Sequence, residues 1–213
     1  MTPLQDLALL LEQGQVQKAA ALTQQLLDEG VSARLVLNDG LIAGMSVVGR
    51  KMRDGEIYLP EVLQSAGAMQ ASLKILKPHL IREGTQSRGK VLLGTVQGDM
   101  HDIGKNLVGI MLQGAGFEIV DLGLNVSPQR FVDAIATENP AIVGLSAMLT
   151  TTMLNMRGTI DEIRAAGLRS NVKVIVGGAP VNQSFADEIG ADGFARDAVL
   201  AVDKVKQLLN LPG

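Results

Sequence analysis

Short apolar runs alternate with amphipathic stretches through the second half of the chain, and this alternation constrains the fold more than any other feature. The apolar runs predict strands at residues 91–96, 118–122, 141–146, 172–176 and, more weakly, 193–195. The stretches between them have helical periodicity, at about 104–113, 129–137, 152–166, 183–189 and 199–209. Nearly continuous apolar strands separated by helices indicate a parallel sheet covered on both faces. We therefore expect residues 90–213 to form an α/β domain with a Rossmann-like (flavodoxin-like), doubly wound sheet of five parallel strands.

The first half of the chain has helical periodicity only. Two helices are expected before Gly14 and Gly30, which act as stop signals, a third over about 33–53, and a fourth from near Pro60 to Pro78. Four amphipathic helices with short connections predict a small four-helix bundle over residues 1–83. The polar, glycine-containing residues 84–89 lack apolar periodicity, so we interpret them as a linker and hinge.

Composition excludes several classes of function. The chain has no cysteine, so disulfides, thiolate metal sites and cysteine nucleophiles are ruled out. A net charge of −3 and 2% aromatic residues argue against a nucleic-acid partner, which requires basic clusters or stacking platforms. The sequence shows no secretory signal and no apolar run of about 18 residues, so we expect a cytoplasmic protein without a membrane partner.

Four strand-end segments carry the chemistry of the predicted sheet. Ligands of an open parallel sheet bind beyond the carboxyl ends of its strands, where residues 98–104, 123–125, 146–152 and 177–180 are expected to meet. His101 lies in the first of these segments, between Asp99 and Asp102. A neutral imidazole is a good transition-metal ligand, and a carboxylate such as Asp99 usually fixes its tautomer. These residues alone predict a metal or cofactor site, although a loop histidine stabilised by Asp99 is an equally good interpretation of His101 by itself.

The spacing of the motif residues is more specific. Asp99, His101 and Gly104 are followed after 41 residues by Ser146-x-Met148, and after another 28 by Gly177-Gly178. This pattern resembles the cobalamin-binding signature Asp-x-His-x-x-Gly, Ser-x-Leu, Gly-Gly. Methionine stands where the family usually has leucine, an exchange of similar volume that should hardly affect packing.

The first half extends the resemblance over nearly the whole chain. Residues 44–49 and 55–66 are similar to the helical cap module of methionine synthase and of small corrinoid proteins from anaerobic methyltransferase systems. The resemblance implies a cobalamin (vitamin B12) cofactor, as methylcobalamin, cob(I)alamin or a related corrinoid, in anaerobic one-carbon metabolism. It also implies "base-off, His-on" binding, with His101 as the lower ligand of the cobalt.

The resemblance assigns the other site residues. Asp99 and the hydroxyl of Thr152, where the family often has serine, would form the relay behind His101. The displaced nucleotide tail would enter a slot, and further residues would complete the binding site around the corrin or cap its upper face. The slot residues are Ser146, Thr150, Gly177 and Gly178; the further binding residues are Gly98, Met100, Asp102, Ile103, Gly104 and Met148; the cap residues are Met52, where methionine synthase has phenylalanine, Leu59 and Val62.

The function implied is that of a methyl carrier. The chain would move a methyl group on cobalt between a substrate-specific methyltransferase and an acceptor methyltransferase, with a reductive activase as a further partner. We do not expect it to turn over alone, because it offers no general acid or nucleophile of its own. Two alternatives keep the same cofactor: a cobalamin-dependent sensor or regulator, which normally carries a basic DNA-binding module, and the cobalamin-binding subunit of a mutase, for which a cap is not expected.

Overall fold

The structure is a computed structural model that describes residues 2–83 and 87–211. The chain divides into two compact units, one of residues 1–88 together with 113–116 and one of residues 89–112 together with 117–213. Residues 84–86 of the expected linker lie outside the described residues. None of the helices in the described ranges is long and apolar enough to cross a membrane.

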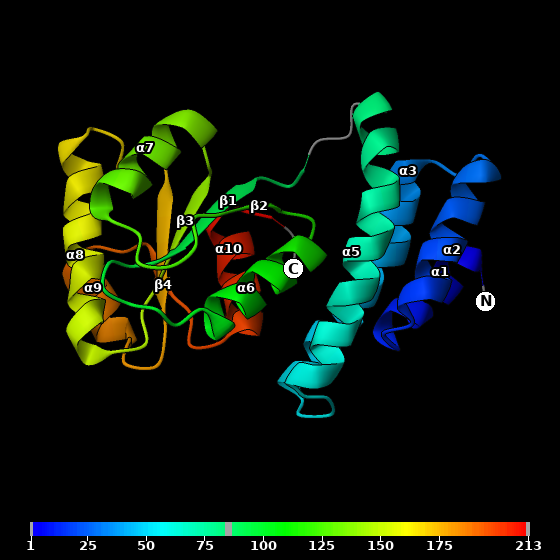
Figure 1. Cartoon of the computed structure of the whole chain (residues 1–213), viewed down its shortest axis with the longest axis horizontal. Helices are drawn as coiled ribbons and strands as arrows, with labels where there is room; N and C mark the ends of the chain where they lie inside the picture. Colours follow the sequence, from blue (N-terminus) through cyan, green and yellow to red (C-terminus); the bar gives the residue numbers. More distant parts are fainter. Residues whose placement is uncertain (1, 84–86, 212–213) are drawn as a thin grey trace. The chain divides into compact units, whose positions relative to one another are not determined.

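Four helical runs form the first unit (Figure 1). The first, α1, begins with a capping box between Thr2 and Gln5. The third run is continuous, but its middle is a π-helix in which Gly40 and Leu41 are buried. The runs are α1 (Pro3–Glu12), α2 (Val16–Asp28), α3 (Ala33–Leu35) with η1 (Val36–Ile42) and α4 (Ala43–Arg53), and α5 (Leu59–Arg82).

Two features of this unit differ from the sequence-based expectation. The π segment was not foreseen, because helical periodicity does not distinguish i→i+4 from i→i+5 hydrogen bonding. The predicted end of the last helix at Pro78 is wrong, since α5 continues to Arg82. Pro78 removes only one backbone donor from the helix. The fully buried Leu76, two residues before it, shows that tertiary packing stabilises this part of α5.

The second unit is a five-stranded parallel sheet in the order β2-β1-β3-β4-β5, which confirms the predicted α/β fold class. Its strands are β1 (Lys90–Thr95), β2 (Glu118–Asp121), β3 (Ile142–Ser146), β4 (Lys173–Gly177) and β5 (Gly193–Phe194). Its helices are α6 (Ile103–Gly114), α7 (Pro128–Glu138), α8 (Thr150–Ala165), α9 (Gln183–Ile189) and α10 (Ala198–Leu208). Figure 1 shows α7, α8 and α9 on one face and α6 and α10 on the other.

The strand order places the binding edge. The chain leaves β1 toward β2 and returns on the other side of β1 at β3, so the topological switch point lies between β1 and β3. A crevice opens at such a point beyond the carboxyl ends of the strands. The register aligns Thr95 with Ser146 and Ser146 with Gly177, so the last residues of three neighbouring strands meet there.

Candidate functional site

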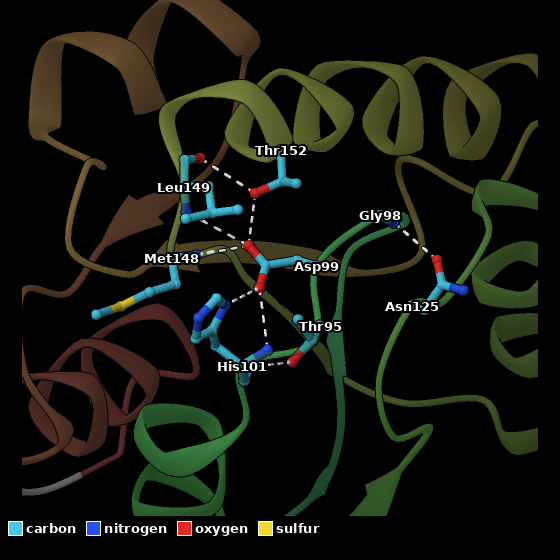
Figure 2. A network of polar contacts seen from close by, with 8 residues as sticks. All are labelled: Thr95, Gly98, Asp99, His101, Asn125, Met148, Leu149 and Thr152. Atoms are coloured by element: carbon cyan, nitrogen blue, oxygen red, sulfur yellow. Dashed lines mark hydrogen bonds and ion pairs between the residues drawn. The ribbon is translucent and has the colours of Figure 1, made fainter.

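Asp99 organises the loop between β1 and α6, and all of the polar contacts of its carboxylate lie within the α/β unit (Figure 2). The carboxylate is fully buried. Its Oδ1 accepts from the backbone N–H of His101 at 3.0 Å and contacts the ring Nδ1 of His101 at 2.8 Å. Its Oδ2 accepts from the N–H groups of Met148 and Leu149 at 2.8 and 3.4 Å, and from the Thr152 hydroxyl at 2.5 Å. One side chain thereby ties the His101 loop to the loop between β3 and α8.

The charge of Asp99 follows from these contacts. Burial alone raises the pKa of the carboxyl, but hydrogen bonds from Thr152, from the Met148 N–H and from His101 outweigh burial and hold the pKa well below its usual range. The carboxylate is therefore ionised at neutral pH and only accepts hydrogen bonds. Nδ1 of His101 must carry the proton that it shares with Asp99, so the lone pair of the neutral ring lies on Nε2.

The imidazole of His101 is accessible. Its side chain is 54% exposed, whereas the carboxylate that holds it is fully buried. Met100, Ile103 and Met148 are also exposed, at 66, 72 and 51%. Large apolar side chains gathered in the same loops as an exposed metal-ligand residue are typical of a site for a large, partly apolar ligand. A metal that arrives inside a macrocycle needs one protein ligand, and Nε2 of His101 is a ring nitrogen that could donate to it.

The glycine pair at the end of β4 serves the protein backbone itself. A Cβ on Gly178, whose φ is +130°, would lie 1.8 Å from the carbonyl oxygen of Ala147. A Cβ on Gly177 would lie 2.8 Å from the carbonyl oxygen of Ala195. Neighbouring strand-end segments therefore approach each other too closely at these positions for a side chain. The place of the two glycines in a slot for the nucleotide tail stays a prediction.

Gly104, the glycine of the first motif block, has open space beside it. A Cβ built at this position, in the first turn of α6, would meet no atom within 4 Å. The space beside it is therefore open. Asp102, two residues earlier, is partly buried and accepts a hydrogen bond from the Asn106 side chain at 3.0 Å.

The remaining predicted residues of the α/β unit lie at the same edge. Gly98 donates its N–H to the side-chain oxygen of Asn125 at 2.7 Å. Ser146 is partly buried at the end of β3, and Thr150 is exposed at the start of α8. The structure thus brings all three blocks of the sequence motif to one edge of the sheet.

The three predicted cap residues belong to the helical unit. Met52, near the end of α4, and Leu59, the first residue of α5, are partly exposed. Val62 is fully buried, as a packing residue would be. Their contact with a cofactor stays a prediction.

Sequence reasoning assigned no role to two residues that shape the loop. Thr95, the last residue of β1, is fully buried and donates its hydroxyl to the carbonyl of His101 at 3.0 Å. Asn125 has a left-handed backbone, with φ of 51°, and its N–H donates to the carbonyl of Asp99 at 3.1 Å. A hydroxyl at the end of an apolar strand was the available signal for Thr95, and the tolerance of asparagine for positive φ was the signal for Asn125.

Comparison with known proteins identifies the family. Models of the B12 binding domain match residues 89–203 and, as a second type, residues 3–77. A corrinoid protein of Desulfitobacterium hafniense is 40% identical over 98% of both chains, and the trimethylamine corrinoid protein of Methanosarcina barkeri is 41% identical over 91% of this chain and 90% of its own.

Solved structures agree with the sequence matches. A cobalamin-binding protein from D. hafniense is 32% identical with a TM-score of 0.79, covering 98% of this chain and 99% of that one. A chain of the methanol:cobalamin methyltransferase complex from M. barkeri is 28% identical with a TM-score of 0.88, covering 98% of this chain and 80% of that one. Together with the exposed imidazole on a buried carboxylate, these matches show that the chain belongs to the B12-binding corrinoid proteins.

Proposed function

We propose that this protein binds a corrinoid in the base-off, His-on form and carries a methyl group on its cobalt between two methyltransferases. One observation carries the proposal: His101 is exposed, while Asp99 holds its Nδ1 at 2.8 Å and leaves Nε2 open. Such an imidazole is preorganised as a metal ligand, because its tautomer and orientation are set before the metal arrives.

The chain's own residues divide the work of holding the cofactor. His101 gives the lower nitrogen ligand, Asp99 sets its tautomer, and Thr152 holds Asp99 at 2.5 Å. Two methionines, Met100 and Met148, present exposed apolar surface beside the imidazole for the underside of the macrocycle. Ile103 and the open space at Gly104 extend this surface.

The displaced nucleotide tail needs its own channel. We assign it to the edge between β3 and β4, where Ser146 and Gly177 stand side by side in the register and Thr150 is exposed nearby. The hydroxyl groups of Ser146 and Thr150 are suited to the polar groups of a nucleotide. Met52 and Leu59 of the helical unit, both partly exposed, are proposed to cover the upper face, whereas the fully buried Val62 has the burial of a packing residue.

The partners follow from the chemistry. When bound, the corrinoid supplies a cobalt that accepts a methyl group and gives it up again. Relatives of this chain are named as trimethylamine and dimethylamine corrinoid proteins, and one similar structure is part of a methanol:cobalamin methyltransferase complex. We therefore propose that a methyltransferase acting on a small methylated amine or alcohol methylates the bound corrinoid, and that a second methyltransferase removes the methyl group.

Visible spectroscopy of the corrinoid-loaded protein tests the binding mode. Hydroxocobalamin is added to the wild-type protein and to two variants, His101→Ala and the control His79→Ala, which removes the other histidine of the sequence. We expect the His101 variant alone to lose the spectrum of a nitrogen-ligated cobalt. Identical spectra for the wild type and His101→Ala would contradict the binding mode.

Methyl uptake tests the carrier role. The loaded protein is reduced and incubated with trimethylamine, dimethylamine or methanol together with the methyltransferase specific for each. Methylation of the bound corrinoid with one of these pairs supports the proposal. A protein that selects adenosylcobalamin and takes up no methyl group from any pair would instead be a mutase subunit.

A further inference from the structure

Thr95 contacts the backbone of His101, the proposed metal ligand. The hydroxyl of this fully buried residue donates to the carbonyl oxygen of His101 at 3.0 Å (Figure 2). The backbone of Thr95 is itself held by the segment that follows β2, because its N–H donates to the carbonyl of Gly123 at 3.0 Å and its carbonyl accepts from the N–H of Val126 at 2.9 Å. The hydroxyl is therefore a rigid point to which the loop is attached.

His101 requires such a point. With its side chain 54% exposed, packing does little to fix the ring, so hydrogen bonds must set its direction. The two hydrogen bonds that His101 donates to Asp99, from its backbone N–H and from Nδ1, end on the same oxygen, Oδ1. Two bonds that meet at one atom leave the residue free to pivot about that atom. The Thr95 hydroxyl holds the opposite end of the residue, the carbonyl, and so removes this freedom.

We infer that Thr95 is a positioning residue for the metal ligand: it fixes the backbone of His101 so that Nε2 points steadily toward the bound cobalt. The inference rests on the proposed ligation by His101 and adds a residue that does not touch the cofactor. Loss of a residue that orients a metal ligand typically weakens metal affinity by a factor of about 10 to 100. Because the two contacts from Asp99 remain, we expect the loss of the Thr95 hydroxyl to weaken corrinoid binding about tenfold, at the lower end of that range.

The test compares four variants of the full chain. Thr95→Val removes the hydroxyl and keeps the shape, and Thr95→Ser keeps the hydroxyl. Thr159→Val is the matched control, since Thr159 is also fully buried in the α/β unit and its hydroxyl donates to one backbone carbonyl, at 2.8 Å. Thr95→Ala, compared with Thr95→Ser, gives the same contrast if the valine variant fails to fold.

Three measurements are made on each variant. They are the dissociation constant for hydroxocobalamin from a visible titration, the nitrogen hyperfine splitting in the electron paramagnetic resonance spectrum after reduction to Co(II), and the urea midpoint of the ligand-free protein. We expect Thr95→Val to bind about tenfold more weakly and to lose or broaden the nitrogen splitting. Thr95→Ser should restore both, and Thr159→Val should change only the urea midpoint.

The two proposals fail in different ways. If Thr95→Val folds and matches Thr159→Val in affinity and in nitrogen splitting, Thr95 is merely structural and the inference is overturned. If the wild type itself shows no nitrogen splitting that depends on His101, the binding mode is overturned, and the inference with it.

Discussion

Replacing Asp99 by asparagine should damage the protein before any cofactor is bound. The carboxylate accepts at both oxygens, with two contacts from His101 on Oδ1 and three donors, from Met148, Leu149 and Thr152, on Oδ2. An asparagine of the same shape offers one oxygen and one NH₂ group. Either orientation of the amide therefore places a donor against donors in a fully buried position.

The cost can be worked from these contacts. The cheaper orientation turns NH₂ toward His101, whose ring can accept at Nδ1 by changing tautomer, while its backbone N–H is left without an acceptor. An unsatisfied buried N–H costs about 1–3 kcal/mol, and the bonds on the other oxygen lose roughly half their strength with the charge. We expect Asp99→Asn to lower the free energy of unfolding of the α/β unit by about 2–4 kcal/mol. The tautomer change also moves the proton to Nε2, so cobalt ligation should be lost.

Urea unfolding of the ligand-free chain and hydrogen exchange measure this effect. Asp102→Asn is the matched control, because it changes a carboxylate of the same loop that accepts one side-chain hydrogen bond, from Asn106. Asp99→Asn should lower the midpoint and speed exchange at the Met148 amide, whereas the control should stay within about 0.5 kcal/mol of the wild type. A wild-type midpoint for Asp99→Asn would refute the view that this carboxylate holds the two loops together.

Three further changes have defined outcomes. Gly178→Ala should cost about 2–4 kcal/mol by urea unfolding, because its Cβ would lie 1.8 Å from a backbone oxygen at a φ of +130°. Asp121→Asn should cost about 1–2 kcal/mol, and more than Lys105→Met, because it leaves the 4%-exposed Lys105 ammonium without its charged partner at 2.5 Å. Glu83→Gln should remove a pH-dependent part of the stability. Hydrogen bonds, chiefly from the Ala33 N–H at the start of α3, lower the pKa of Glu83 from 4.5, so its contribution is full above that value and is lost as the pH falls through the lower folded-state pKa.

Each of these changes has a control and a contradicting result. The control is Gly104→Ala, whose Cβ meets nothing within 4 Å and which should leave the free energy of unfolding of the ligand-free protein unchanged. If Gly178→Ala were no more destabilising than Gly104→Ala, the backbone around Gly178 would have to relax to make room for the Cβ. A larger loss for Lys105→Met than for Asp121→Asn would mean that packing of the lysine, and not its charge, is what matters. For Glu83, thermal midpoints of wild type and variant should converge at acid pH, and a constant difference across the titration would show that the charge of the carboxylate does not strengthen its hydrogen bond from the Ala33 N–H.

Much of the α/β unit could be predicted from the sequence because its signals are local. Each of the five predicted strands appears within about one residue of its expected bounds, since a short apolar run between turn residues is a strong local pattern. The helical unit was harder. Both the π segment at Val36–Ile42 and the continuation of α5 through Pro78 depend on packing against neighbouring helices, which periodicity does not encode.

In the site, too, contacts between residues close in sequence could be predicted, and contacts between distant residues could not. Asp99 and His101 are two residues apart in one loop, so their contact could be predicted from chain geometry alone. The donors to the second oxygen of Asp99 come from residues 49, 50 and 53 positions away, and only the pairing of β3 with β1, which aligns Ser146 with Thr95, brings them to it.

The sequence by itself determined the order of helices and strands, the parallel sheet and the edge at which the motif residues gather, because these follow from hydrophobic periodicity and from the direction of the strands. Only the tertiary structure decided that Thr95 holds the His101 carbonyl and that Gly178 is required by the Ala147 backbone. Hydrogen bonds and steric contacts act over a few ångströms. Between segments that are distant in sequence, the distances between atoms are set by strand register and helix packing rather than by residue spacing.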